Sequence, residues 1–242
     1  MNSSQQDAHV QLWLAPVAAC EPAQLAAYET LLSPDERARW TRFRYPADRL
    51  RFLIGRAFMR TVLAECLGHG AAAALQFTLT PHGKPELGGR DAGELHFNLS
   101  HTDELLVLAI SRAHTVGVDV EAVTRNVELL ALAQRYFAAH EYTGLLALDT
   151  AAQRERFFVL WTLMEAWLKA RGLGLRIPLD AFSFSLAGRH PAIEFGPQLP
   201  GHPQDWQFRV LAHDQFRIAL AVECAASPPL QVQKRTWCRQ AA

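Results

Sequence analysis

Apolar and polar residues alternate along some stretches of the chain and follow a helical repeat along others. The first pattern is typical of half-buried strands, and the second is typical of helices that pack one face against a core. Alternating or continuous apolar segments predict strands at 10–14, 75–79, 95–97, 105–111, 116–121, 182–186, 208–212 and 216–222. The helical repeat predicts helices at 22–32, from Ser33 onward, and at 52–67, 128–137, 139–147 and 157–172. The residues from 227 onward show neither pattern, so we expect a loosely attached tail there.

The predicted helix at 157–172 places Trp161, Glu165 and Lys169 on one face, because each lies four residues after the last. Most other positions of this segment are aromatic or aliphatic, so we expect the helix to be buried nearly all round. A carboxylate and an ammonium group on such a helix need partners. The alternative interpretation is an ordinary Glu–Lys pair on a helix surface, which stabilises a helix by about 0.2–0.5 kcal/mol.

The predicted strand at 116–121 carries two acidic side chains on one face. Its alternation turns Val118 and Val120 one way and Asp119 and Glu121 the other, with the two carboxylates about 7 Å apart. Neighbouring carboxylates repel each other unless a cation lies between them, and Mg²⁺ suits such a pair because it prefers oxygen ligands. A solvent-facing edge strand with ordinary acidic residues is the alternative.

Two predicted turns carry polar side chains that could reach a ligand. Gly83 and Pro85 flank Lys84 in the first turn, so we expect Lys84 to be exposed and held in a defined place. Ser100 and His101 follow the strand at 95–97, and we expect them in the turn to the next strand. We do not favour a nucleophile–base dyad for this pair, since no acidic residue beside it would orient the histidine.

A strongly basic segment follows the helix start at Ser33, where Ser33, Pro34 and Glu36 form a capping box. Between residues 35 and 60, eight arginines accompany three acidic residues, which gives a local net charge of +5. Guanidinium groups bind phosphate best when several converge in one cleft. A solvated helix face is the alternative interpretation.

Composition limits the possible partners and location. The 242 residues are 50% hydrophobic and contain 24 Lys+Arg and 24 Asp+Glu, so one domain or two small domains are possible, and no overall charge favours nucleic acid or a membrane. Cys20, Cys66, Cys224 and Cys238 show no metal-binding or disulfide spacing, and we interpret them as free thiols. No segment reads as a signal peptide or a membrane span. We therefore expect a soluble, cytoplasmic protein.

Five motifs, taken together, resemble the larger, surfactin-synthetase-activating type of 4′-phosphopantetheinyl transferase. They occur in the order and approximate spacing of that family: Gly83-Lys84-Pro85, the segment 97–101, Gly117-Asp119-Glu121, Arg135-Phe137-Glu141 and Trp161-Glu165-Lys169. The resemblance implies an α/β (α+β) monomer of two similar halves related by a pseudo-two-fold axis. Coenzyme A and Mg²⁺ would lie in the cleft between the halves, which we expect at 1–112 and 113–242.

The resemblance also implies roles for individual residues. Asp119, Glu121 and Glu165 match the carboxylates around a Mg²⁺ ion that binds the pyrophosphate of coenzyme A. The side chains that match phosphate contacts are Lys84, Ser100, His101 and Lys169. Arg39 and Arg51 match basic positions near the nucleotide end of the cofactor.

The reaction implied is attack by a serine of an apo acyl or peptidyl carrier protein on the β-phosphate of coenzyme A. The phosphopantetheine arm is left on the serine, and adenosine 3′,5′-bisphosphate is released. Glu165 would take the serine proton, and Lys169 would neutralise the phosphate.

One residue departs from the family pattern. Position 164 carries methionine where the family usually has lysine, and we expect Met164 at the edge of the active face. Two other function classes stay open: a non-catalytic module that binds coenzyme A or a carrier protein, and a metal-dependent phosphoesterase that acts on nucleotides. Retention of all three carboxylates disfavours the first.

Overall fold

The computed structural model describes residues 8–17, 20–174, 177–225 and 228–237 as a mixed α/β chain, which confirms the expected fold class. The first strands are β1 (His9–Pro16), β2 (Phe77–Leu79), β3 (Pro85–Leu87), β4 (His96–His101) and β5 (Leu105–Ser111). The helices among them are α1 (Pro22–Thr30), α2 (Pro34–Trp40) and α3 (Pro46–Leu67).

The second part of the chain repeats this mixture of elements. Its strands are β6 (Val116–Ala122), β7 (Phe182–Ser185), β8 (Ala192–Phe195), β9 (Trp206–His213), β10 (Phe216–Glu223) and β11 (Gln231–Thr236). Its helices are α4 (Leu129–Tyr136), α5 (Ala139–Leu146) and α6 (Thr150–Arg171). Short 3₁₀ turns lie at η1 (Ala72–Ala74), η2 (Gly89–Asp91), η4 (Leu179–Ala181) and η5 (Pro203–Asp205).

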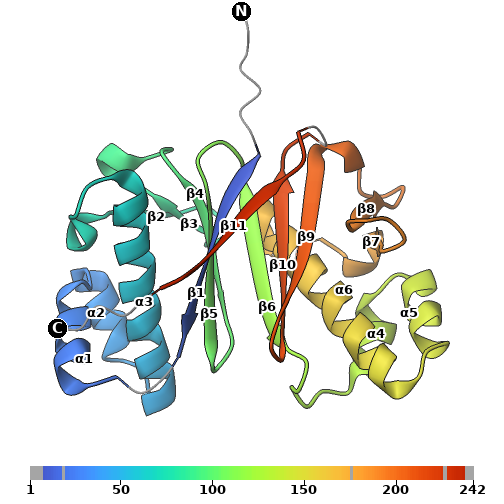
Figure 1. Ribbon diagram of the computed structural model, residues 1–242, viewed down its shortest axis with the longest axis horizontal. Helices are drawn as coiled ribbons and strands as arrows, with labels where there is room; N and C mark the ends of the chain where they lie inside the picture. Colours follow the sequence, from blue (N-terminus) through green and yellow to red (C-terminus); the bar gives the residue numbers. More distant parts are fainter. Residues whose placement is uncertain (1–7, 18–19, 175–176, 226–227, 238–242) are drawn as a thin grey trace, which may run out of the picture.

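The two larger sheets pack face to face, each with a long helix on its outer side (Figure 1). Their strand orders are β11-β1-β5-β4 and β6-β10-β9. Because side chains alternate along a strand, every second residue of β1 and β5 packs toward α3, and the others lie between the sheets. In β10, Ala219 and Ala221 join the core with α6, while Ile218 and Leu220 lie between the sheets. The chain therefore forms four layers: helix, sheet, sheet and helix.

The helix starts depend on capping residues as much as on the apolar pattern. The capping box predicted for α2 is confirmed, because Ser33 Oγ accepts from Glu36 N at 3.3 Å and Glu36 Oε2 accepts from Ser33 N at 2.9 Å. Helix α6 begins at Thr150 rather than at 157, and Asp149 caps it by accepting a hydrogen bond from Ala152 N at 2.9 Å. Its first turns are largely polar, so no apolar repeat marks them. The prediction also missed the short strands β3 and β8.

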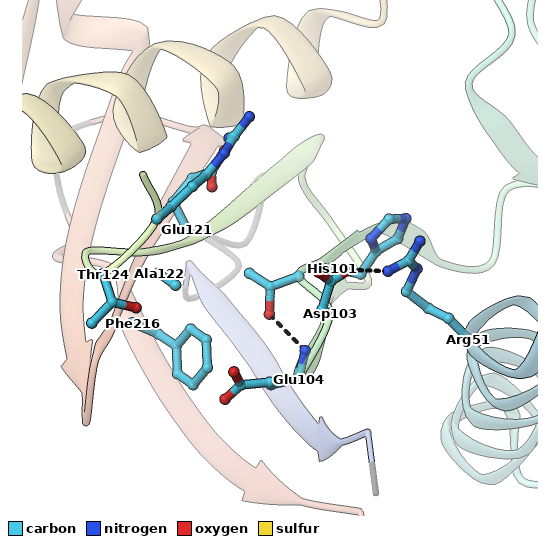
Figure 2. A pocket seen from close by; sticks show the side chains of 10 residues that line it. Arg51, His101, Asp103, Glu104, Glu121, Ala122, Thr124 and Phe216 are labelled. Atoms are coloured by element: carbon cyan, nitrogen blue, oxygen red, sulfur yellow. Dashed lines mark hydrogen bonds and ion pairs between the residues drawn. The ribbon is translucent and has the colours of Figure 1, made fainter. Parts of the chain in front are cut away.

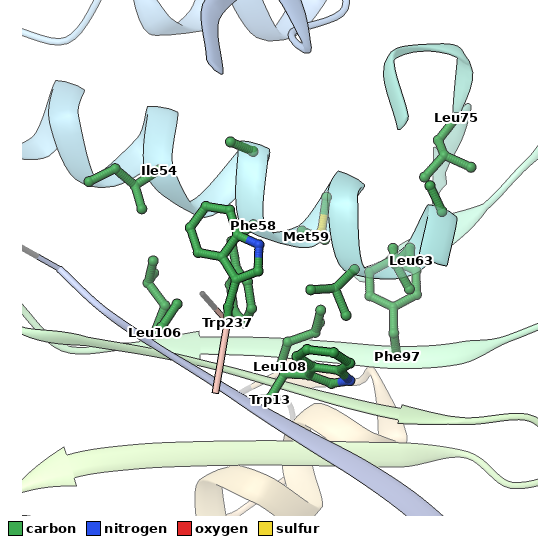
Figure 3. Packing of buried hydrophobic residues seen from close by; sticks show 14 of the residues in the cluster. Trp13, Ile54, Phe58, Met59, Leu63, Leu75, Phe97, Leu106, Leu108 and Trp237 are labelled. Atoms are coloured by element: carbon green, nitrogen blue, oxygen red, sulfur yellow. The ribbon is translucent and has the colours of Figure 1, made fainter. Parts of the chain in front are cut away.

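The prediction of a loosely attached tail is wrong. Strand β11 pairs in parallel with β1, from His9 opposite Gln231 to Leu14 opposite Thr236. Trp237 then enters the core beside α3, where it is 8% exposed and its ring lies 5.3 Å from that of Phe58 (Figure 3). Because β11 lies at a sheet edge and is mostly polar, its sequence has no apolar repeat that predicts a strand.

Three further expectations concern the domain boundary, the cysteines and membrane spans. The boundary between two halves at residues 112/113 stays a prediction. Cys20, Cys66 and Cys224 form no disulfide within the described part of the chain, and Cys238 lies outside the described residues. None of the helices among the described residues combines the length and apolarity needed to cross a membrane.

Candidate active site

Lys169 of α6 contacts Asp119 of β6 and Ser100 of β4. Its Nζ lies 2.6 Å from Asp119 Oδ1 and donates to Ser100 Oγ at 2.9 Å. Ser100 Oγ in turn donates to Asp119 Oδ1 at 2.9 Å. Asp119 and Ser100 are 5% and 4% exposed, so water screens this contact weakly. Segments that are far apart in the sequence thus supply one acid, one hydroxyl and one ammonium group to the same cluster.

Gly117 allows β6 to lie close enough to α6 for this contact. A Cβ at Gly117 would overlap the backbone of Ala166 and Ala170 in the helix. Asp119 lies two residues further along the strand and therefore on the same face. The glycine at this position sets the spacing on which the Asp119–Lys169 pair depends.

Glu121 and Glu165 lie near Asp119, and burial raises the pKa of each carboxyl. The negative charge of Asp119 raises both pKa values further. Glu121 Oε1 lies 2.8 Å from Arg125, whereas Asp119 Oδ2 is buried and has no hydrogen-bond partner in the described structure. Three carboxylates that repel one another, one with an unpartnered buried oxygen, fit a hard cation such as Mg²⁺.

These side chains are not already arranged as metal ligands. Across the described ranges, no three His, Cys, Asp or Glu residues surround a common metal position. Basic side chains pair with two of the carboxylates instead, Lys169 with Asp119 and Arg125 with Glu121. The three carboxylates therefore suit Mg²⁺ chemically. In the present side-chain positions, however, Lys169 and Arg125 neutralise two of them.

Ser100 and His101 lie in β4 rather than in the predicted turn, which begins at Thr102. The strand alternation buries Ser100 against Asp119 and puts His101 on the opposite face of β4, where its side chain is exposed at the strand end. Partial burial lowers the pKa of His101, and the charges of Arg51 and Lys169 lower it further. The lowered pKa favours the neutral imidazole, which can donate one hydrogen bond.

Lys84 is half-buried, not exposed as predicted. Its Nζ donates to the carbonyl of Ala170 at 2.9 Å, near the end of α6, and burial lowers the pKa of this amine. Lys84, Glu165 and Lys169 line one cavity of about 220 Å³. The β2–β3 hairpin thus brings Lys84 to the helix that carries two other predicted site residues.

Further cavities adjoin this cluster. One of about 480 Å³ has Glu121 on one side and His101 with Arg51 on the other (Figure 2). Another, of about 370 Å³, is lined by Arg39, Arg51 and His101, among others. Since Arg51 and His101 line both, these cavities meet at the predicted phosphate and nucleotide contacts.

The basic segment does not act as one surface. Arg39, Arg51 and Arg56 converge on the cavity of about 370 Å³, next to the rings of Phe43 and Phe52. Arg60 is 1% exposed, pairs with Glu36 at 2.8 Å and donates to backbone carbonyls. The alternative of a solvated helix face fails for Arg60, whereas Arg37, Arg42, Arg44 and Arg49 are exposed.

Met164 does not lie at the edge of the active face. It is 4% exposed and belongs to the core between α6 and its neighbours. Trp161 lies partly in the same core, stacked on Phe157 at 5.7 Å, and lines a cavity of about 240 Å³ with Glu165. Glu165 thus lines cavities on two sides.

Sequence reasoning assigned no role to Asn98 or Arg125. Asn98 Oδ1 accepts from Val118 N at 2.9 Å and so joins β4 to β6 across the two sheets. The strand alternation that places Asn98 on the face of Ser100 could have indicated it. No sequence pattern marks Arg125, which follows β6. Glu141 is structural, because its carboxylate accepts from Phe184 N at 2.8 Å and Ala138 N at 3.1 Å.

Known proteins match this chain along most of its length. A sequence model of the 4′-phosphopantetheinyl transferase superfamily matches residues 115–221, and one for the N-terminal part of 4′-phosphopantetheinyl transferases matches residues 19–113. The 4′-phosphopantetheinyl transferase HetI of Nostoc sp. is 37% identical over 76% of this chain and 76% of its own length. The transferase Sfp of Bacillus subtilis is 32% identical over 83% of this chain and 85% of its own length. A putative 4′-phosphopantetheinyl transferase of Synechocystis sp. is 36% identical over 68% of this chain and 65% of its own length.

Proposed function

The chain belongs to the 4′-phosphopantetheinyl transferase superfamily, and we propose that it transfers the 4′-phosphopantetheine arm of coenzyme A to a carrier-protein serine. The acceptor is an apo acyl or peptidyl carrier protein, the reaction depends on Mg²⁺, and adenosine 3′,5′-bisphosphate is released. The observation that carries this proposal is the contact of Lys169 with Asp119 and Ser100. It joins three of the family motifs in one buried cluster.

The cavities suit the charge of coenzyme A. Arg39 and Arg51 supply guanidinium groups for the phosphate at the nucleotide end, where Phe52 offers an aromatic face. Lys84, Ser100, His101 and Lys169 are the proposed contacts of the pyrophosphate. These groups lie along adjoining cavities, so one extended anionic molecule can reach all of them.

Asp119, Glu121 and Glu165 are the proposed ligands of Mg²⁺. The unpartnered Asp119 Oδ2 and the mutual repulsion of the carboxylates support this assignment. When bound, the ion supplies positive charge to the pyrophosphate and so stabilises the leaving group.

The side chains of the protein account for the remaining steps of the reaction. Glu165 accepts the proton of the carrier serine as the general base. The serine oxygen forms a bond to the β-phosphorus as the bond to the bridging oxygen breaks, and adenosine 3′,5′-bisphosphate leaves with that electron pair. Lys169 and Lys84 neutralise negative charge that develops on the phosphate oxygens.

Glu165 lines the cavity with Lys84 and Lys169 on one side and the cavity with Trp161 on the other. We propose that the donor binds in the first and that the carrier serine approaches from the second. The monomeric state stays a prediction, and so does the cytoplasmic location.

Intact-mass measurement after incubation with coenzyme A, MgCl₂ and an apo carrier protein tests the proposal. The carrier should gain the mass of one phosphopantetheine arm, and chelation of the metal should prevent the gain. Binding of coenzyme A with an unchanged carrier mass would indicate the non-catalytic module instead. Phosphate release from a nucleotide with an unchanged carrier mass would indicate the phosphoesterase.

A further inference from the structure

Arg125 is a basic residue of the site that has no assigned role. It lies in the loop after β6, with its guanidinium 2.8 Å from Glu121 Oε1. Its side chain is 55% exposed, whereas that of Glu121 is 17% exposed. The pair therefore joins a partly buried carboxylate to a cation that has room to move.

The backbone beneath Arg125 is held in place. Arg154 of α6 donates from Nη1 to the carbonyls of Val123 and Arg125, at 2.8 and 2.9 Å. Val123 N donates to Gln215 O at 2.8 Å, and Arg125 N donates to Ala122 O at 3.0 Å. These bonds fix the point from which the side chain extends and leave its guanidinium free to change partners.

Arg125 also lines two cavities, one of which Glu121 lines as well. It lines the cavity of about 480 Å³ with Arg51 and His101, which are proposed contacts of coenzyme A. It lines the cavity of about 240 Å³ with Trp161 and Glu165. The guanidinium thus pairs with one proposed metal ligand and lines the same cavity as two proposed phosphate contacts.

We propose that Arg125 is a switching contact for coenzyme A, which pairs with Glu121 in the unliganded protein and turns to the phosphates when Glu121 takes up Mg²⁺. This inference rests on the proposed function. A guanidinium binds carboxylate and phosphate with the same planar donors, so either anion satisfies it. Once a divalent cation neutralises Glu121, like charges repel and the pairing of Arg125 with Glu121 is lost.

Two binding constants, one for Mg²⁺ and one for coenzyme A, distinguish a switching Arg125 from a merely structural one. If Arg125 competes with the ion for Glu121, its removal must tighten Mg²⁺ binding in the absence of coenzyme A. If it then contacts the phosphates, the same change must weaken the binding of coenzyme A. An Arg125 that merely stabilises the loop would weaken both when removed.

Isothermal titration of Arg125→Gln with MgCl₂ alone, and with coenzyme A in excess MgCl₂, separates these possibilities. We expect a lower Kd for Mg²⁺ and a Kd for coenzyme A raised by about tenfold, the factor for about one lost charge-assisted hydrogen bond. Arg125→Lys should recover part of the coenzyme A affinity. Arg189→Gln removes an equal charge from the exposed loop between β7 and β8 and should leave both constants unchanged.

An unchanged or higher Kd for Mg²⁺ in Arg125→Gln, or an unchanged Kd for coenzyme A, would overturn the role of Arg125. Transfer of the arm by the wild type is measured by carrier mass in parallel. If the wild type transfers the arm but has the same Kd values for Mg²⁺ and coenzyme A as Arg125→Gln, only the inference about Arg125 is contradicted. A wild type that transfers nothing contradicts the proposed function and this inference with it.

Discussion

Lys169 Nζ lies 2.6 Å from Asp119 Oδ1, although the two residues are 50 positions apart in the sequence. The pair joins α6 to β6 and neutralises a carboxylate that is 5% exposed. A buried charge is costly unless it is paired, so the partner groups of Asp119 decide its chemistry. Any cation that binds Asp119 must therefore share it with Lys169 or displace the ammonium.

Asp119→Asn should abolish transfer while leaving the fold intact. The amide keeps the size of the side chain and can still accept from Ser100, but it is a far weaker ligand for a hard cation. Carrier mass measures transfer, titration with MgCl₂ measures metal binding, and circular dichroism measures the fold. Asp180→Asn changes an exposed acid outside the cavities and should transfer at the wild-type rate. Wild-type turnover by Asp119→Asn would show that the metal site is wrongly placed.

Gly117→Ala should destabilise the protein and lower its activity, because a Cβ there would overlap the backbone of Ala166 and Ala170. Separating β6 from α6 should cost about 1–3 kcal/mol in the free energy of unfolding and pull Asp119 away from Lys169. Urea denaturation measures the first effect, and the transfer rate measures the second.

Gly144→Ala is the matched control, since a Cβ at this exposed position of α5 meets nothing within 4 Å. Alanine is the better helix former, so this change should stabilise the protein by about 0.5–1 kcal/mol. Equal effects of the two substitutions would contradict the role given to the close approach at Gly117.

Elements with a strong local pattern could be predicted from the sequence. The capping box at Ser33 and the alternation in β6 are examples, because short-range chemistry determines both. The alternation also predicted that Asp119 and Glu121 share a face. The edge strand β11 could not be predicted, because its pairing with β1 stabilises a mostly polar sequence. The start of α6 was missed because its first turns have no apolar repeat, although Asp149 caps it locally.

The site itself was only partly predictable. Motif spacing named Asp119, Glu165 and Lys169, but no local pattern shows that β6 approaches α6 closely enough for the Lys169–Asp119 contact. Lys84 illustrates the same limit, since its turn was predicted but its contact with Ala170 comes from a distant helix. Such contacts depend on the packing of whole elements rather than on neighbours in the chain.

Lys84→Met and His101→Ala should each raise the KM for coenzyme A more than they lower kcat. Both residues line proposed cofactor cavities, and among the described residues no carboxylate forms a hydrogen bond with either side chain that would orient it as a base. Loss of one charge-assisted contact should raise KM by about tenfold. Steady-state kinetics with varied coenzyme A measures both constants, with His190→Ala as an exposed control. A large fall in kcat at constant KM would argue against a binding role.

Stabilisation by MgCl₂ should grow as pH rises. Burial and the charge of Asp119 raise the pKa of Glu121 and Glu165 above the ordinary value of 4.5, so the folded chain holds more protons than the unfolded chain just above pH 4.5. The metal-free protein must then lose stability as pH rises through the window between 4.5 and the raised values. If Mg²⁺ binds the ionised carboxylates as proposed, it should reverse this loss.

Melting temperatures with and without MgCl₂, taken from about pH 4.5 upward, test this pH dependence. Glu165→Gln should reduce both the pH dependence and the shift that MgCl₂ causes. Glu94→Gln, in an exposed loop, should change neither. A shift caused by MgCl₂ that is equal at every pH would show that these carboxylates do not bind the ion.

Met164→Lys should lower both stability and activity. Met164 is 4% exposed within the core of α6 and its neighbours, so a lysine there must bury an ammonium group or distort the helix to reach water. We expect a loss of about 3 kcal/mol in the free energy of unfolding, as for other unpaired buried charges. The helix carries Glu165 and Lys169, so a distortion should also slow transfer. Met164→Leu keeps the volume and apolarity and should cost less than about 1.5 kcal/mol. A Met164→Lys enzyme that is faster than the wild type at an unchanged melting temperature would mean that the new ammonium reaches the phosphates without disturbing the core.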